Sequence, residues 1–207
     1  MFRNTHHAGA KIGGRSGARQ LVAAAALIVF GAVAQPATAV PQNDPPVSVS
    51  EDEGVYSVAA TFAVPQAASF AIAALTDYAQ IPRFMPEVRM STVLERADDR
   101  TIVEQEAVAR FMMFSKRVHL VLEVQEEGGP IRLIRFRDRC GKSFARYEGA
   151  WTIAESDGHT HITYELSAKP SFEVPEFVLK RLLKRDATHM IERLKAEIEA
   201  RARQPAR

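Results

Sequence analysis

The chain has 207 residues, with 27 lysines and arginines, 25 aspartates and glutamates, and a single cysteine. This length favours one folded domain, and one cysteine excludes an internal disulfide. Residues 1–39 contain four basic residues and no acidic one, so the remainder carries 23 basic and 25 acidic residues, a net charge of −2. That balance gives no support for nucleic-acid binding.

The first 39 residues have the pattern of a secretory signal peptide. Basic residues precede an apolar run over residues 21–34, and Ala37 and Ala39 stand at the spacing that signal peptidase requires. The apolar run is too short to span a bilayer comfortably. We therefore expect cleavage and a periplasmic or secreted protein, with an uncleaved anchor in the inner membrane as the alternative.

Residues 40–54 are rich in proline, serine and acidic residues, a composition that indicates a flexible linker. The folded domain is expected over residues 55–201. A short tail at residues 202–207 completes the chain.

The start of the domain combines one strand with two short helices. Residues 55–64 have the β-branched and aromatic content of a strand. Residues 66–75 are alanine-rich and predict a helix, and Asp77 is placed to cap a second short helix over residues 78–81. Residues 82–86 carry a proline at each end, which predicts a turn that presents Phe84 and Met85.

Beyond this segment, short stretches of alternating residues are joined by turn residues. The clearest is 118–124, where apolar and polar residues alternate strictly. A turn is predicted just before it, at Ser115 and Lys116. Short connections between neighbouring strands predict an antiparallel sheet with one buried face. The sheet has about seven strands: 55–64, 88–96, 101–113, 118–124, 132–140, 145–153 and 162–168.

The chain closes with a helix that begins at Pro175 and spans about 25 residues, because leucines, isoleucines and other apolar residues recur there at steps of three and four. Since no second sheet is available, this helix must cover the buried face of the first. A straight helix cannot fill all the space on the concave face of a curved sheet, so we expect a cavity or tunnel at one end.

No catalytic or metal-binding motif stands out. The sequence lacks a Gly-x-Ser-x-Gly elbow, a His-Glu-x-x-His motif and a phosphate-binding glycine loop. His159 and His161 share one face of a strand and could meet a metal ion. The alternation of that strand assigns them to the solvent face, so we expect neither a metal nor a cofactor.

Asp138 is the one weak catalytic candidate besides Tyr164. It shares the strand face of Ile134 and Phe136, so its carboxylate is expected to point towards the cavity, where it could bind a ligand hydroxyl or act as a base. The alternative is a bulge that turns Asp138 towards solvent or an arginine.

Two surface features have alternative interpretations. Residues 111–114 are all apolar, so they either form an apolar lip that contacts a membrane or lie beneath the first helices. The last helix carries eight lysines and arginines between residues 180 and 203. These residues either contact anionic lipid headgroups or form a solvated helix face.

Four segments together resemble one family over residues 55–200. They are Asp77-Tyr78 with the stretch Pro82-Arg83-Phe84-Met85-Pro86-Glu87-Val88, then residues 114–118, then Arg146-Tyr147-Glu148-Gly149-Ala150-Trp151, and finally Val174-Pro175. In this order they resemble the START-like (Bet v 1-like, SRPBCC) superfamily, and most of all its bacterial branch of polyketide cyclases/dehydrases and coenzyme Q-binding proteins.

The resemblance implies an α+β helix-grip fold, in which a curved antiparallel sheet surrounds a long C-terminal helix. It implies an internal cavity for a hydrophobic ligand such as a lipid, a quinone or a polyketide-like molecule. Binding or transport is the favoured function, and a cyclase or dehydratase that uses polar cavity residues is the alternative. Peripheral membrane contact is a further possibility. The expected ligand-binding residues are Phe84, Met85, Phe111, Met113, Tyr147, Trp151, Tyr164, Phe172 and Phe177.

Overall fold

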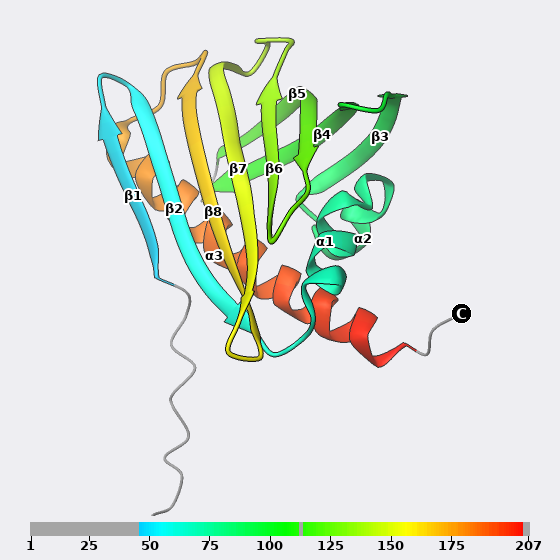
Figure 1. Cartoon of the computed structure of the whole chain (residues 1–207). Helices are drawn as coiled ribbons and strands as arrows, with labels where there is room; N and C mark the ends of the chain where they lie inside the picture. The colour runs from blue at the N-terminus through cyan, green and yellow to red at the C-terminus, as the bar shows by residue number, and fades with distance from the viewer. Residues whose placement is uncertain (1–45, 112–113, 205–207) are drawn as a thin grey trace, which may run out of the picture. The chain divides into compact units, whose positions relative to one another are not determined.

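An eight-stranded antiparallel sheet, in the order β1-β2-β8-β7-β6-β5-β4-β3, curves around a long helix in the computed structural model (Figure 1). The structure describes residues 46–111 and 114–204. The strands are β1 (Val47–Asp52), β2 (Val55–Val64), β3 (Val88–Arg96), β4 (Thr101–Phe111), β5 (Phe114–Glu127), β6 (Ile131–Asp138), β7 (Phe144–Ser156) and β8 (His159–Pro170). The helices are α1 (Ala68–Thr76), the single 3-10 turn η1 (Tyr78–Gln80), α2 (Ile81–Phe84) and α3 (Glu176–Arg203). The α+β helix-grip fold expected from the sequence is confirmed.

The sheet has one strand more than expected. Val47–Asp52, which the sequence analysis assigns to a linker, form strand β1 and pair with β2 from Val47↔Ala60 to Asp52↔Val55. The linker prediction is wrong for these residues. Val47 and Val49 alternate there with serines, so both valines lie on the same face of the strand. Val47 is buried in the core, and Val49 packs against the core residues.

Strand β5 also begins earlier than expected. Ser115 and Lys116, where a turn is predicted, lie within β5 and pair with Arg110 and Ala109 of β4. The polar character of the two residues suggested a turn, but a strand with one solvated face carries polar residues as well.

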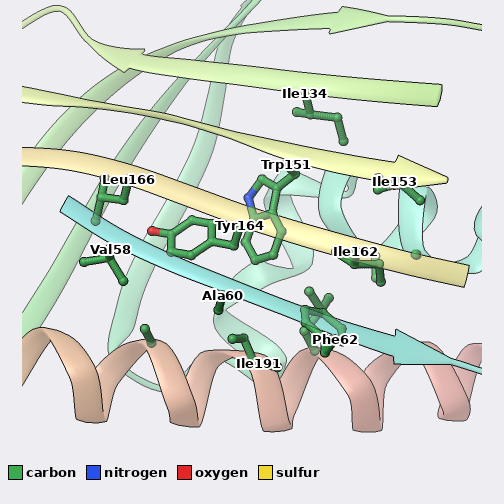
Figure 2. Packing of buried hydrophobic residues seen from close by; sticks show 14 of the residues in the cluster. Val58, Ala60, Phe62, Ile134, Trp151, Ile153, Ile162, Tyr164, Leu166 and Ile191 are labelled. Atoms are coloured by element: carbon green, nitrogen blue, oxygen red, sulfur yellow. The ribbon is translucent and has the colours of Figure 1, made fainter. Parts of the chain in front are cut away.

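The buried face of the sheet supports a continuous apolar core. Strand β5 turns Val118, Leu120, Leu122 and Val124 inwards, as the strict alternation of its sequence predicts. Figure 2 shows how side chains from β2, β6, β7 and β8 gather on the side of the sheet that faces α3, with Ile191 of the helix beside Ala60 and Phe62 of β2. Helix α3 packs against strands β1 and β2.

Helix α3 is 28 residues long, or about 42 Å at 1.5 Å per residue. Three of its arginines reach other elements. Arg185 donates to the backbone carbonyl of Arg110 at the end of β4, Arg193 pairs with Glu87, and Arg201 contacts Asp77 at 3.2 Å. The helix is thereby bound to both the far strands and the α1–α2 region, which lies beside its second half (Figure 1).

No helix within the described residues is long and apolar enough to cross a bilayer. The predicted signal peptide at 1–39, the first residues of the predicted linker and residues 205–207 of the predicted tail lie outside the described residues.

Candidate ligand-binding site

Two chambers lie between α3 and the strands that curve away from it. The inner chamber has a volume of about 300 Å³ and is bounded by α1, η1, α2 and strands β3 to β8. The outer chamber has a volume of about 520 Å³ and is bounded by β4, β5, the residues between β8 and α3, and the first half of α3. Seventeen of the 20 residues that line the inner chamber are apolar or aromatic. Both spaces therefore suit a hydrophobic molecule.

A group of polar side chains stands where the chambers meet. Five polar or amphipathic residues line both chambers, and we call them the polar belt: Glu87, Gln105, Tyr147, Tyr164 and Asp186. They come from the start of β3, from β4, β7 and β8, and from the middle of α3. The belt thus lies between a mainly apolar inner chamber and an outer chamber that Ser115, Lys116 and Glu173 also line.

Aromatic rings form the sheet side of the inner chamber. Tyr164 packs against Trp151 with ring centroids 4.5 Å apart, as Figure 2 shows, and it stacks on Phe136 at 6.4 Å. Phe136 also contacts Tyr147 at 6.0 Å. Gly149 makes this arrangement possible, because a Cβ atom there would collide with the Phe136 ring and with the carbonyl of Glu165.

The two belt tyrosines are linked and remain protonated. A side-chain hydrogen bond links the hydroxyl groups of Tyr147 and Tyr164. Burial, and then the nearby charge of Asp138, raise the pKa of Tyr147 to about 12. Burial likewise raises the pKa of Tyr164 well above its usual value. At neutral pH both phenols therefore act as hydrogen-bonding groups and not as bases.

The two belt carboxylates have opposite electrostatic environments. Burial acts to raise the pKa of Glu87, but hydrogen bonds from its own backbone amide and from Arg193 outweigh it and hold that pKa below its usual value. Burial raises the pKa of Asp186, and the hydrogen bonds from Arg185, at 3.0 and 2.8 Å, only partly oppose this effect. Glu87 is thus stably ionised, whereas burial makes the ionised form of Asp186 less favourable.

The proline-flanked segment forms one wall of the inner chamber. Tyr78, Ile81, Phe84 and Met85 all line it, so the expected places of Phe84 and Met85 agree with the structure. Pro82 does not exclude a helix, because it lies in the first turn of α2, where its missing N–H costs nothing. Tyr78 donates to Glu126 at 3.0 Å, and this bond attaches the segment to the end of β5.

Asp77 does not act as the expected helix cap. It stands before η1 but makes no capping hydrogen bond with its side chain. Its carboxylate accepts from Arg201 at 3.2 Å, while the same guanidinium donates to the carbonyl of Ala73 at 2.9 Å. Asp77 therefore attaches the chamber wall to the end of α3.

The outer chamber ends near the β4–β5 hairpin and the residues that follow β8. Phe172 lines it, contacts Phe144 at 6.3 Å and lies under the ammonium group of Lys116 at 4.7 Å. This cation–π contact joins β5 to the residues between β8 and α3. Met113 and the side chain of Phe111, both expected to bind ligand, lie outside the described part of the structure.

Phe177 differs from expectation. Phe177 is 75% exposed and lines neither chamber. Consecutive helix residues are about 100° apart, so Phe177 points almost opposite to Leu179, which is buried. The residues of the first helical turns that do face the outer chamber are Val178, Leu179, Leu182 and Leu183.

Asp138 occupies a structural position and lines neither chamber. Strand β6 ends there, and its carboxylate accepts from the backbone amides of Val121 at 2.8 Å, Cys140 at 3.3 Å and Gly141 at 2.9 Å. Strand β6 keeps its register with β5 as far as Asp138, which pairs with Leu122, so the bulge expected as the alternative does not occur and backbone amides occupy the carboxylate. Its oxygens stabilise the turn and are not directed at a ligand.

The histidines of β8 are solvent-exposed, as the alternation of that strand predicts. Among the described residues, no group of three or more histidine, cysteine, aspartate or glutamate side chains is placed to hold a metal ion.

Three belt residues escaped the sequence analysis, although a signal for two of them was present. Gln105 lies on the inward face of its strand, between Val103 and Ala107 in the alternation. Asp186 is three residues after Leu183 on the apolar side of the last helix. A polar residue at an inward position is the pattern that finds both, whereas nothing in the sequence around Glu87 indicates its partner on α3.

A curved antiparallel sheet, a long C-terminal helix and an apolar cavity between them define the class of helix-grip ligand-binding folds. Within that class, the chain belongs to the family described as polyketide cyclase / dehydrase and lipid transport, whose profile matches residues 64–195. This match confirms the family resemblance drawn from the sequence.

Solved structures of lipid transfer proteins and of an aromatase/cyclase share the fold. A STAR-related lipid transfer protein from Xanthomonas axonopodis is 17% identical, with a TM-score of 0.60, over 76% of this chain and 99% of that one. Human StAR-related lipid transfer protein 5 is 9% identical, with a TM-score of 0.63, over 77% and 88%. The Zhui aromatase/cyclase from Streptomyces sp. R1128 is 13% identical, with a TM-score of 0.56, over 72% and 96%. A comparison with curated proteins finds no match.

Proposed function

We propose that this protein binds and carries a hydrophobic small molecule in its two-chamber cavity without transforming it. The observation that carries this proposal is the apolar lining of both chambers, which together surround a space large enough for a lipid-sized ligand. The family includes lipid transport proteins, which supports the same conclusion.

The polar groups near the cavity favour binding over chemistry. Asp138 already accepts three backbone amides, and the pKa values of Tyr147 and Tyr164 are too high for either to remove a proton at neutral pH. Glu87 is engaged by Arg193. These groups can orient a ligand, but they do not form a nucleophile–base pair.

A cyclase or dehydratase is the alternative, and Asp186 is the observation that favours it. Its raised pKa and its place in the belt would allow it to exchange a proton with a bound carbonyl or hydroxyl compound. Under this alternative, a polyketide-like ligand would leave the cavity chemically changed, whereas a carried ligand leaves unchanged.

We further propose that the protein works in the periplasm and meets its ligand at a membrane surface. The signal-like leader supports this location. Phe177 supports membrane contact, because it is exposed beside Val178 at the outer chamber and Lys180 follows within the same turn.

Native mass spectrometry of protein purified from its own cells tests the main proposal, together with titration of the neutral fluorescent probe N-phenyl-1-naphthylamine. We expect co-purified lipid-sized molecules and saturable uptake of the probe. Ala107→Phe should weaken uptake, because Ala107 lines the outer chamber. Glu106→Phe on the same strand adds a ring on the opposite face and is the matched control. Preparations without lipid that also fail to take up the probe would refute the proposal.

A further inference from the structure

The polar belt divides a cavity whose other lining residues are mainly apolar, and this division constrains the ligand. A molecule that fills both chambers must place some part of itself beside Tyr147, Gln105 and Asp186. If that part were apolar, the belt groups would lose water without gaining a hydrogen bond, which costs about 1–3 kcal/mol for each unsatisfied group. The ligand must therefore carry a polar group between two apolar parts.

The hydrogen-bonding capacity of the belt indicates which polar group fits. Gln105 uses its amide nitrogen to donate to Ser91 at 3.2 Å, so its carbonyl oxygen is the acceptor that it can offer to the cavity. Arg185 donates to Oδ1 of Asp186, so Oδ2 is the carboxyl oxygen that Asp186 can offer to a ligand. The hydroxyl groups of Tyr147 and Tyr164 share one hydrogen bond, which leaves one phenolic O–H to donate. The belt thus presents one phenolic donor, the second N–H of the Gln105 amide and two acceptor oxygens.

A hydroxyl group matches this set, because it accepts one hydrogen bond and donates another. A carboxylate does not, since it only accepts and would lie beside the carboxyl groups of Asp186 and Glu87. A keto group can use the phenolic donor but leaves both acceptors without a partner. Resting on the proposed binding function, we propose that the ligand is a neutral apolar molecule with a hydroxyl group near its middle.

Three esters that differ only in one hydroxyl group test this inference: methyl stearate, methyl 2-hydroxystearate and methyl 12-hydroxystearate. Each is used to displace N-phenyl-1-naphthylamine from the full protein. One additional net hydrogen bond should make the 12-hydroxy ester bind about five- to tenfold more tightly than methyl stearate. The 2-hydroxy ester, whose hydroxyl lies at one end, should gain little.

Two belt variants locate the preference. Asp186→Leu and Tyr147→Phe should each reduce the advantage of the 12-hydroxy ester to less than twofold while leaving the binding of methyl stearate equal or tighter. Glu192→Leu is the matched control for the helix variant, because Glu192 is an acidic residue on the exposed side of α3. It should keep the full preference.

The outcomes separate this inference from the proposed function. If the wild-type protein binds all three esters equally, the inference is wrong while the carrier function stands. If the preference survives in both belt variants, the hydroxyl is not recognised by the belt and the inference is also wrong. If no ester displaces the probe and the probe itself does not bind, the proposed function fails with it.

Discussion

The two halves of α3 carry the same kind of apolar stripe but have different surroundings. In the second half, Ile191 and Ile198 are completely buried and line neither chamber. In the first half, Leu182 and Leu183 face the outer chamber and remain only partly buried. The same periodic pattern therefore builds a packed core at one end of the helix and the wall of a cavity at the other. The stripe alone does not distinguish the two, because the difference comes from what lies opposite.

The largest expected effect is on the packed half. Ile198→Ala should lower the free energy of unfolding by about 2–5 kcal/mol, because it opens a cavity in a fully buried site. Leu182→Ala, the matched change in the first half, should cost about 1 kcal/mol or less, since its side chain already borders open space. Urea unfolding midpoints with unchanged slopes provide the measurement. Equal losses at both positions would refute the contrast.

The sheet wall of the inner chamber is expected to tolerate substitution less well than the helix wall of the outer chamber. Gly149→Ala should destabilise the protein by about 1–3 kcal/mol, because the new methyl group overlaps Phe136 and the Glu165 carbonyl. It should also weaken uptake of N-phenyl-1-naphthylamine, since Phe136 must leave its stack with Tyr164. Ala150→Ser, at the next residue of β7, is the control. Full stability of the alanine variant would show that the wall can shift freely.

The two belt carboxylates should respond to pH in opposite directions. Folding raises the pKa of Asp186. Its favourable contribution to stability is therefore present below the pKa of the unfolded state and is lost as the pH rises through the pKa of the folded state. Asp186→Asn should therefore raise the melting temperature at pH 7, by roughly 1–3 °C, with a smaller gain towards pH 4.

Glu87 is the matched case with the opposite sign. Its lowered pKa means a contribution that is present above the unfolded pKa and is lost as the pH falls through the folded value. Glu87→Gln should lower the melting temperature at pH 7 and have little effect in acid. Melting temperatures of both variants, measured across pH 3–8, test this prediction. If they change with pH in the same direction relative to the wild type, the two carboxylates do not have opposite pKa shifts.

The smallest expected effect on stability is at the surface of the first half of α3. Phe177→Ser should leave the unfolding midpoint unchanged within about 0.5 kcal/mol, because the ring is exposed. It should reduce sedimentation of the protein with vesicles of phosphatidylglycerol and phosphatidylethanolamine. Leu94→Ser changes another exposed apolar residue, on β3, and is the control. Equal vesicle binding by both variants and the wild type would exclude the proposed contact.

Much of the fold could be predicted from the sequence, because alternation in strands such as 118–124 and the stripe of the last helix are local signals. Strand β1 could not, since its pairing with β2 depends on a partner that lies beyond a tight turn and its composition is that of a linker. Within the site, aromatic residues on inward faces predicted Tyr147, Trp151 and Tyr164 as ligand-binding residues, and all three line the inner chamber. Their contact with a ligand stays a prediction.

What the sequence could not provide is the direction of a side chain where a regular element begins or ends. Phe177 lies in the first turn of its helix, and Asp138 is the last residue of its strand. At such positions the periodicity has too few neighbours to fix the orientation. Pairs such as Glu87 with Arg193 join residues that are distant in the sequence, and only the folded arrangement brings them together.

The three arginines that bind α3 to other elements also limit how the cavity can open. Arg185, Arg193 and Arg201 recur every eighth residue, so their attachment points are about 12 Å apart along the helix axis. A helix fixed at three places cannot swing away as a rigid lid. Only the part before Arg185 is free of these ties, so ligand exchange should proceed by local fraying of the first two turns together with the residues that precede them. Because these contacts are partly exposed and charged, higher salt should loosen them and speed exchange.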